Sequence, residues 1–332
     1  MIRNSGVGLH SVRAVLLLLV LSVTGCGDFV ETLGTDTSLR TPHVSWNSYN
    51  LYQYDNGGWQ LLVDLGQPTG VAPTLGESPV VIVHGLGDRI IGPFDGLAQN
   101  LRANGASSVF AFEYDSLDPI EKNGEFFGQA LDFLTTRESG RSFRFVTHSL
   151  GCLVARSQFE KGQTFDMALT GNQVSLVAGP HEGSPVAAEL NAMEQTLAQQ
   201  AVAQLVLNGQ LLFFNANGNP IDVMGDEPIF SELVPGSDAL NTLNAQAASR
   251  HPQFIYRTMA GNERGLDYQV FAQLIGIFAD DGIVDVESAN SPVVGQVSTV
   301  VAPNDHSSII RNQAPQLVII DQIGLLQESE SE

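Results

Sequence analysis

Apolar residues in the central part of the chain follow two patterns, short continuous runs and longer stretches with helical spacing. The run Val80-Val81-Ile82-Val83 is apolar at every position, which is typical of a strand buried on both faces of a sheet. The same pattern predicts strands at 109–112, 143–146, 174–178, 254–259 and 297–301, and helices at 97–103, 126–135 and 316–326. Strands that alternate with helices predict an α/β fold, in which a mostly parallel central sheet carries helices on both faces.

A different pattern precedes this region. Residues 44–54 and 59–63 are strand-like and flank Asn56-Gly57-Gly58. Turn residues between two such segments predict a β-hairpin.

The alternation stops between residues 187 and about 235, where no strand of this kind is predicted. Large apolar side chains nevertheless crowd the stretch 197–214, among them Leu205, Leu212 and Phe213. A helix packed into the core is one interpretation, and a cap over a hydrophobic pocket is the other. We favour the cap, because the stretch interrupts the sheet pattern, and we expect these three side chains to line a substrate pocket.

Residues 1–25 have the pattern of an export signal. Arg3 and Arg13 precede a short apolar run, and Val23-Thr24-Gly25-Cys26 follows. The run is too short to span a bilayer, and an ordinary signal peptide with a nearby cysteine is one interpretation. The ending also resembles the lipobox of bacterial lipoproteins, which implies removal of residues 1–25 and a lipid on Cys26. We therefore expect a lipidated tether over 26–42 and a folded domain over 43–332.

The composition limits the possible partners. The chain has 15 basic and 36 acidic side chains, and removal of residues 1–25 would delete two of the basic ones and no acid. Such a surface argues against binding of nucleic acid and against adhesion to anionic head groups. Only two cysteines are present. With Cys26 acylated, Cys152 would have no partner for an intramolecular disulfide.

The strand at 143–146 leads into Thr147-His148-Ser149-Leu150-Gly151, after which a helical pattern begins. A serine at a sharp strand-to-helix turn forms a nucleophile elbow, which exposes its hydroxyl above the sheet. The usual motif has glycine two residues before the serine, and Thr147 takes that place here. Ser149 is therefore the candidate nucleophile, and His148 is expected to point elsewhere on the turn.

On this kind of fold the catalytic acid and then the histidine follow the serine along the chain. His306 lies in a loop just after the last predicted strand, where the base belongs. His251 comes at the opposite end of its strand, which indicates a structural role. His181 precedes the candidate acids, so we expect it in the substrate pocket. Asp281 is the preferred acid because it precedes Gly282 at a turn where amides can hold it, and its neighbour Asp280 is the alternative.

The first buried strand ends in His84-Gly85-Leu86-Gly87. Glycines there allow the backbone to approach a substrate, so the Leu86 amide is a candidate oxyanion donor. The Leu150 amide, at the start of the helix after Ser149, is the second candidate. We expect His84 to brace this loop.

Together these motifs resemble the bacterial lipase and esterase branch of the α/β-hydrolase superfamily, and in particular triacylglycerol lipases. The resemblance also includes Gly179-Pro180-His181-Glu182-Gly183-Ser184-Pro185, Gly236-Ser237, Leu243-Asn244, Asp281-Gly282-Ile283-Val284 and Asp305-His306-Ser307-Ser308. It implies an α/β-hydrolase fold with a helical cap or lid, and the triad Ser149, Asp281 and His306. No cofactor is implied, and no metal, because Ser308 stands where some members place a calcium ligand.

The expected activity is hydrolysis of carboxylic esters of lipids or other hydrophobic acids through an acyl-enzyme on Ser149. The same triad would serve an acyltransferase, an amidase or a polyester depolymerase. A catalytically inactive, lipid-binding lipoprotein is the alternative from another class. The lipobox implies an exported bacterial lipoprotein that faces the periplasm or the cell exterior, anchored in the outer membrane rather than the inner one.

Overall fold

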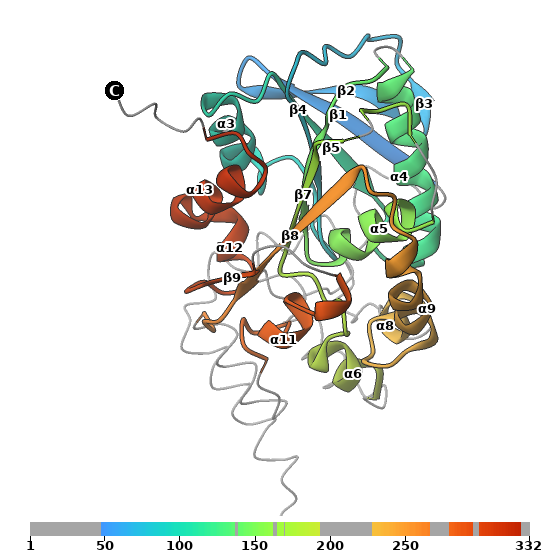
Figure 1. The fold of residues 1–332 in the computed structure, drawn as a ribbon, viewed down its shortest axis with the longest axis vertical. Coiled ribbons are helices and arrows are strands. Elements are labelled where there is room, and N and C mark those ends of the chain that lie inside the picture. The colour runs from blue at the N-terminus through green and yellow to red at the C-terminus, as the bar shows by residue number, and fades with distance from the viewer. Residues whose placement is uncertain are drawn as a thin grey trace, which may run out of the picture.

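The computed structural model describes residues 48–136, 139–161, 165–168, 170–192, 228–265, 279–294 and 299–326. Within these ranges the strands form one sheet with the order β3-β2-β1-β5-β4-β6-β7-β8-β9 (Figure 1). The strands are β1 Tyr49–Asp55, β2 Gly58–Asp64, β3 Gln67–Pro68, β4 Pro79–Val83, β5 Ser108–Tyr114, β6 Arg144–His148, β7 Asn172–Val177, β8 Phe254–Gly261 and β9 Thr299–Ala302. Strands β4 to β9 are parallel, which confirms the predicted sheet.

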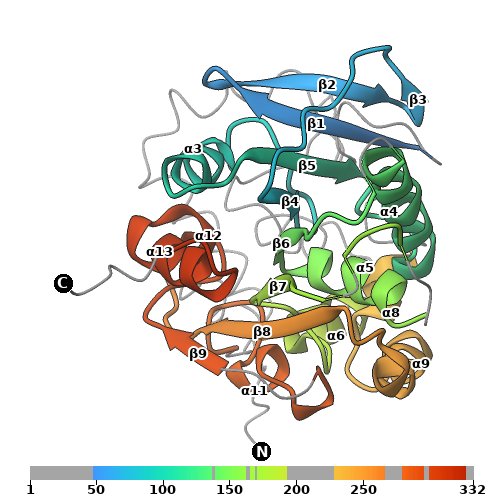
Figure 2. The same ribbon diagram turned by 45° about the horizontal axis from the view of Figure 1, so that its top comes forward.

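The predicted hairpin forms the antiparallel edge of this sheet (Figure 2). Strands β1 and β2 are joined by Asn56 and Gly57, whose φ angles are 49° and 83°. Positive φ at both central residues belongs to the tight turns that match the twist of hairpin strands. Strand β1 then pairs antiparallel with β5 and so attaches the hairpin to the parallel strands.

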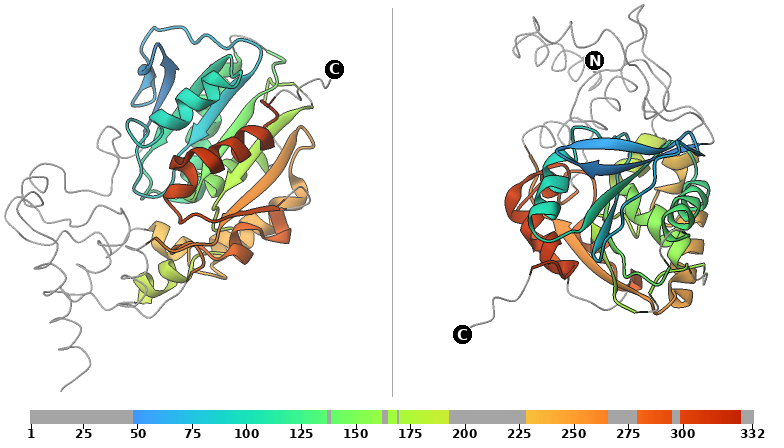
Figure 3. Two further views of the ribbon diagram at one scale, coloured as in Figure 1. Left: turned by 90° about the vertical axis from the view of Figure 1, so that its left-hand side faces the viewer. Right: turned by 90° about the horizontal axis from the view of Figure 1, so that it is seen from above.

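Helices cover both faces of the sheet, as predicted. They are α3 Asp95–Ala103, α4 Ile120–Thr135, α5 Leu150–Phe159, α6 Pro185–Ala192, α8 Pro228–Glu232, α9 Asp238–Gln246, α11 Val286–Ala289, α12 Ser308–Arg311 and α13 Gln313–Gln322. Helices α3 and α13 lie together on one face (Figure 3, left), and α4 packs against α5 on the other. Among these described helices, none combines the length and the apolar character that a membrane span requires.

Strand β4 separates the two layers of the core. Val81 and Val83 pack in the cluster that contains residues of α4 and α5, whereas Val80 and Ile82 pack in the cluster that contains residues of α3 and α13. Successive side chains of a strand point to opposite faces, so a strand buried on both sides needs an apolar residue at every position. The continuous apolar run is therefore explained by the layer on each face.

Helix α4 begins at Ile120, six residues before the predicted start. Gly124 and Gly128 lower the helix propensity of this first part of the helix. A Cβ atom on Gly124 would lie 1.9 Å from the Ser157 hydroxyl, and one on Gly128 would lie 2.9 Å from the Gln158 amide. The two glycines therefore permit the close approach of α4 to α5, and this tertiary contact outweighs their poor propensity.

The predicted cap is described only in part. Helix α6 begins just before it, helix α8 lies within it, and the two helices contact each other. Ile229, Phe230 and Leu233, in and just after α8, are buried. Residues 193–227, including Leu205, Leu212 and Phe213, lie outside the described residues, as does the N-terminal segment with Cys26.

Candidate active site

Ser149 stands at the junction of β6 and α5, as the elbow motif predicts. Its φ and ψ angles are 53° and −125°, a conformation that L-residues rarely adopt. Its amide donates a hydrogen bond to Val177 O on β7, at 2.9 Å. The turn is thus held from the neighbouring strand, and the side chain projects above the carboxyl ends of the parallel strands.

Two glycines are required by the packing around this turn. A Cβ atom on Gly151 would lie 2.4 Å from His84 O, and one on Gly85 would lie 2.8 Å from the Ser149 Cβ. The start of α5 therefore passes against the end of β4 with no room for a side chain at Gly151. This contact explains why glycine follows the serine in the motif.

Thr147 fits where the usual motif has glycine, because its side chain is directed into a small buried space. Its hydroxyl donates to Ser175 O at 3.2 Å and lies 3.2 Å from Cys152 Sγ. Burial raises the pKa of the Cys152 thiol to about 12. Cys152 therefore remains a neutral thiol that fills space under the elbow.

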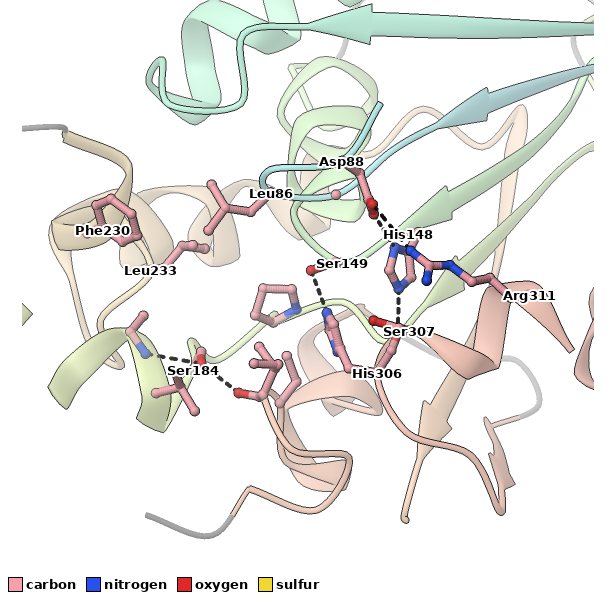
Figure 4. Close-up of a pocket in the computed structure, with 16 residues that line it drawn as sticks. Leu86, Asp88, His148, Ser149, Ser184, Phe230, Leu233, His306, Ser307 and Arg311 are labelled. Atoms are coloured by element: carbon pink, nitrogen blue, oxygen red, sulfur yellow. Dashed lines mark hydrogen bonds and ion pairs between the residues drawn. The ribbon is translucent and has the colours of Figure 1, made fainter. Parts of the chain in front are cut away.

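His306 connects Ser149 to Asp281. Its Nε2 lies 2.8 Å from Ser149 Oγ, and its Nδ1 lies 2.8 Å from Asp281 Oδ2 (Figure 4). The other carboxylate oxygen of Asp281 accepts hydrogen bonds from the amides of Ile283 at 2.9 Å and Val284 at 2.7 Å. The carboxylate is held in place by backbone, so it fixes the orientation of the imidazole ring.

The structure also separates the two candidate acids. Asp280 Oδ2 accepts a hydrogen bond from the Val286 amide at the start of α11, at 2.9 Å. Asp281 is 1% exposed and contacts the histidine directly. The two adjacent aspartates therefore have different partners.

Burial acts to lower the pKa of His306. The charge of Asp281 and its hydrogen bond, together with the charges of Asp88 and Asp305, outweigh burial and raise this pKa above its ordinary value. The surrounding carboxylates thus stabilise the imidazolium form, which a histidine adopts when it accepts the proton of a serine.

The candidate oxyanion donors lie beside the serine. Leu150 is the first residue of α5, where backbone amides have no partner within the helix. Leu86 follows β4 and lines the same pocket as Ser149. His84 braces this loop as expected: its ring stacks on Tyr114 at 4.4 Å, and the Tyr114 hydroxyl donates to His84 O at 2.8 Å.

A pocket opens above Ser149, and its two sides differ. Leu86, Phe230 and Leu233 lie on one side of the serine in Figure 4, and Asp88, His148 and Arg311 lie on the other. The remaining described lining residues are Gly85, Pro180, Ser184, Val186, Ala187, Ile283, Val284, His306 and Ser307. The larger part of the wall is apolar.

The expectation that His181 lines this pocket is wrong. His181 is fully buried and is not among the described residues that line the pocket, although Pro180 and Ser184 are. Its Nδ1 accepts a hydrogen bond from the Arg156 guanidinium at 3.2 Å. Burial, and then the charge of Arg156, lowers the pKa of His181 well below its ordinary value. The neutral ring is therefore held inside the protein by Arg156.

The charged side of the pocket was not predicted. His148 does turn away from Ser149, but its ring faces the pocket between Asp88 and His306. The charged side of the pocket consists of Asp88, His148 and Arg311, and the sequence contains one signal for it. A charged residue stands close to each of two motifs, Asp88 after Gly85-Leu86-Gly87 and Arg311 after the His306 loop. No cluster of three or more side chains suited to bind a metal ion occurs among the described residues.

No protein-family model matches the chain, and no curated protein matches it in sequence. Solved structures do match. The lipase BlEst2 of Bacillus licheniformis in its mature form is 17% identical, with a TM-score of 0.56 over 84% of this chain and 99% of that one. Phospholipase PlaB from Legionella pneumophila, in complex with thio-NAD, is 16% identical, with a TM-score of 0.53 over 75% of this chain and 58% of that one. Identities this low concern the fold alone, and the chain has the α/β-hydrolase fold.

Proposed function

We propose that the protein is a serine hydrolase that cleaves carboxylic esters of hydrophobic acids through an acyl-enzyme on Ser149. One observation carries this proposal: Ser149 Oγ, His306 and Asp281 form a continuous hydrogen-bonded chain with two contacts of 2.8 Å at a largely apolar pocket. A nucleophile, a base and a group that orients the base are the parts that acyl transfer requires.

The proposed reaction has two steps. Ser149 attacks the ester carbonyl while His306 Nε2 accepts its proton, and the Leu86 and Leu150 amides stabilise the oxyanion. His306 then gives this proton to the departing alcohol, which leaves the acyl group on Ser149. In the second step a water molecule gives a proton to His306 and attacks the acyl carbonyl. His306 then returns this proton to Ser149 Oγ as the bond from the acyl group to Ser149 breaks, which releases the acid.

The apolar side of the pocket supports a hydrophobic acyl group. Phe230 and Leu233 come from α8 and the residue after it, and Leu86 lies on the same side of the serine as these two residues (Figure 4). An alkyl chain that binds against apolar walls is removed from water, and these walls have no polar groups that would lose hydrogen bonds to water. Each buried methylene therefore adds about 0.8 kcal/mol of favourable binding free energy.

We expect kcat/KM for p-nitrophenyl esters to rise about fourfold for each methylene added to a short acyl chain, until the pocket is filled. Phe230→Leu should reduce kcat/KM for the decanoate more than for the butyrate, because the lost contact lies along the chain. Initial rates measured with monomeric substrates test both statements. Leu317→Ala, on the exposed side of α13, is the control and should leave the profile unchanged. A profile that is flat in the wild-type protein would contradict a hydrophobic acyl pocket.

We also propose that Cys26 carries lipid and anchors the exported protein to a membrane. The basic start, the short apolar run and the small residues before Cys26 support this. Two or more acyl chains give stable membrane attachment, whereas one chain gives reversible binding.

In a bacterial host, the full chain is expected to incorporate a clickable fatty acid and to sediment with membranes. Cys26→Ala should lose both properties. Cys152→Ala is the matched control, because Cys152 is the other cysteine of the chain and lies buried under the elbow. Equal labelling of the Cys26→Ala variant and the wild type would contradict lipidation at this residue.

A further inference from the structure

Beside the proposed triad lies a second aspartate–histidine pair that the proposed reaction does not use. His148 Nε2 lies 2.8 Å from His306 O, and His148 Nδ1 lies 3.6 Å from Asp88 Oδ2. Arg311 Nη2 lies 3.8 Å from the other carboxylate oxygen of Asp88. Figure 4 shows these side chains together on the charged side of the pocket.

The first of these contacts shows which ring nitrogen of His148 donates a hydrogen bond. A backbone carbonyl accepts hydrogen bonds and cannot donate them, so His148 Nε2 carries a proton and donates it to His306 O. Nδ1 is then the nitrogen that faces Asp88. His148 ends β6 and the residue is only 3% exposed, so its ring is packed next to the elbow.

The carbonyl that receives this bond belongs to the candidate catalytic base itself. His306 lies in a loop between β9 and α12, outside any regular element. On the other side its amide donates to Asp281 O at 3.0 Å. The backbone of His306 is therefore held from both sides, by His148 through the carbonyl and by the acid loop through the amide.

From these contacts we propose that Asp88 and His148 are positioning residues for His306. His148 holds the His306 backbone in line with Ser149, and the Asp88 carboxylate favours the imidazolium that forms when the serine proton is transferred. This inference rests on the proposed role of His306 as the base. An orienting group displaced by as little as 1 Å can cost about 100-fold in rate, so a fixed backbone has a direct catalytic value.

The charged groups around the rings of His306 and His148 determine whether the pKa of His306 is raised or lowered. His306 faces Asp281 from the acid loop, Asp88 from the loop after β4, Asp305 from its own loop and His148 from β6. His148 faces Asp88 and His306, and the charges of His84 and His148 interact. Arg311 contacts the other carboxylate oxygen of Asp88 and lies beside His148 (Figure 4). Asp88 is itself favoured in its charged form: burial acts to raise its pKa, but His148, His84 and Arg311 lower it.

The test of the charge is the pH dependence. Activity requires neutral His306 and should therefore rise with pH through its pKa, at a pH above the ordinary histidine value of about 6.5. Asp88→Asn removes a negative charge that favours the imidazolium, so the pKa of His306 and the acidic limb of kcat/KM should both move down by about half a pH unit. Asp64→Asn, an exposed site on β2, changes the net charge equally and should move neither.

NMR titration of the His306 imidazole gives a second measurement that needs no substrate. A downward shift of the His306 pKa in Asp88→Asn supports the inference, even if no ester is hydrolysed, in which case only the proposed function fails. A His306 pKa that moves no further in Asp88→Asn than in Asp64→Asn overturns the proposed effect of the Asp88 charge.

The test of the hydrogen bond compares two variants of His148. His148→Leu removes the donor to His306 O and should lower kcat at least about tenfold with little change in KM. His148→Gln can place an amide donor near the position of Nε2 and should recover a large part of this loss. Equal kcat in both variants overturns the positioning role of His148. If His148→Leu does not fold, His148→Gln is compared with the wild type: a kcat close to the wild-type value supports the role of the donor, and a loss as large as about tenfold overturns it. The Asp88→Asn titration tests the effect of the charge in either case.

Discussion

Ser149→Ala is expected to lower kcat for ester hydrolysis by about 10⁴-fold or more, while the fold is retained. Ser149 Oγ lies 2.8 Å from His306 Nε2, and no acyl-enzyme can form without this oxygen. The backbone amides of Leu86 and Leu150 would remain and can polarise a bound ester for attack by water, which explains a small residual rate. Alanine removes one polar atom from the pocket wall and leaves the hydrogen bond from the Ser149 amide to Val177 O intact.

The measurement is hydrolysis of p-nitrophenyl esters, combined with labelling by a fluorophosphonate probe. Ser184 provides a matched control, because it lines the same pocket but donates its hydroxyl proton to Ile283 O at 2.6 Å. We expect Ser184→Ala to keep the label and Ser149→Ala to lose it. Labelling of the Ser149→Ala variant at the wild-type rate would show that the nucleophile lies elsewhere. Failure of the probe to label Ser149 in the wild-type protein would instead restore the alternative of a catalytically inactive, lipid-binding protein.

The sequence predicted those parts of the fold that depend on local pattern and on burial. The apolar run of β4 is buried on both faces, and the Asn56-Gly57 turn forms the hairpin at the edge of the sheet. The start of α4 was placed too late, because Gly124 is a poor helix former taken alone. Glycine is required at position 124 because α4 lies close to Ser157 on α5 there, and a contact between two helices cannot be predicted from the local sequence pattern.

In the active site, too, local motifs could be predicted from the sequence, whereas contacts between distant segments could not. The order serine, acid, histidine along the chain led to Ser149, Asp281 and His306, which the structure brings into contact. His181 was misplaced because motif position indicates the loop but not the direction of the side chain, and a buried Arg156 lies 25 positions earlier. Asp88 and His148, 60 positions apart, meet only through the packing of β4 against β6. Contacts of this kind depend on tertiary geometry and leave no periodic trace in the sequence.

Asp281→Asn is expected to lower kcat by about 10³- to 10⁴-fold while the fold is preserved. The asparagine oxygen can still accept the hydrogen bonds from the Ile283 and Val284 amides, which leaves its NH₂ group facing His306 Nδ1. An NH₂ donor requires a lone pair on Nδ1, so the proton of the neutral ring moves to Nε2, the atom that faces Ser149. In this tautomer His306 cannot accept the serine proton, and the charge that favours the imidazolium is lost as well.

Asp280→Asn is the matched control for this prediction, since it changes the neighbouring residue and the net charge in the same way. Its carboxylate accepts only the Val286 amide among the described contacts, and an asparagine oxygen can do the same, so kcat should stay within a few-fold of the wild type. The thermal unfolding midpoint of both variants, measured alongside kcat, separates catalytic loss from unfolding. If Asp280→Asn loses activity and Asp281→Asn does not, Asp280 is the acid, and the hydrogen bond between Asp281 and His306 has no catalytic role. Equal, large losses in both folded variants would instead point to the acid loop as a unit, with no special part for either carboxylate.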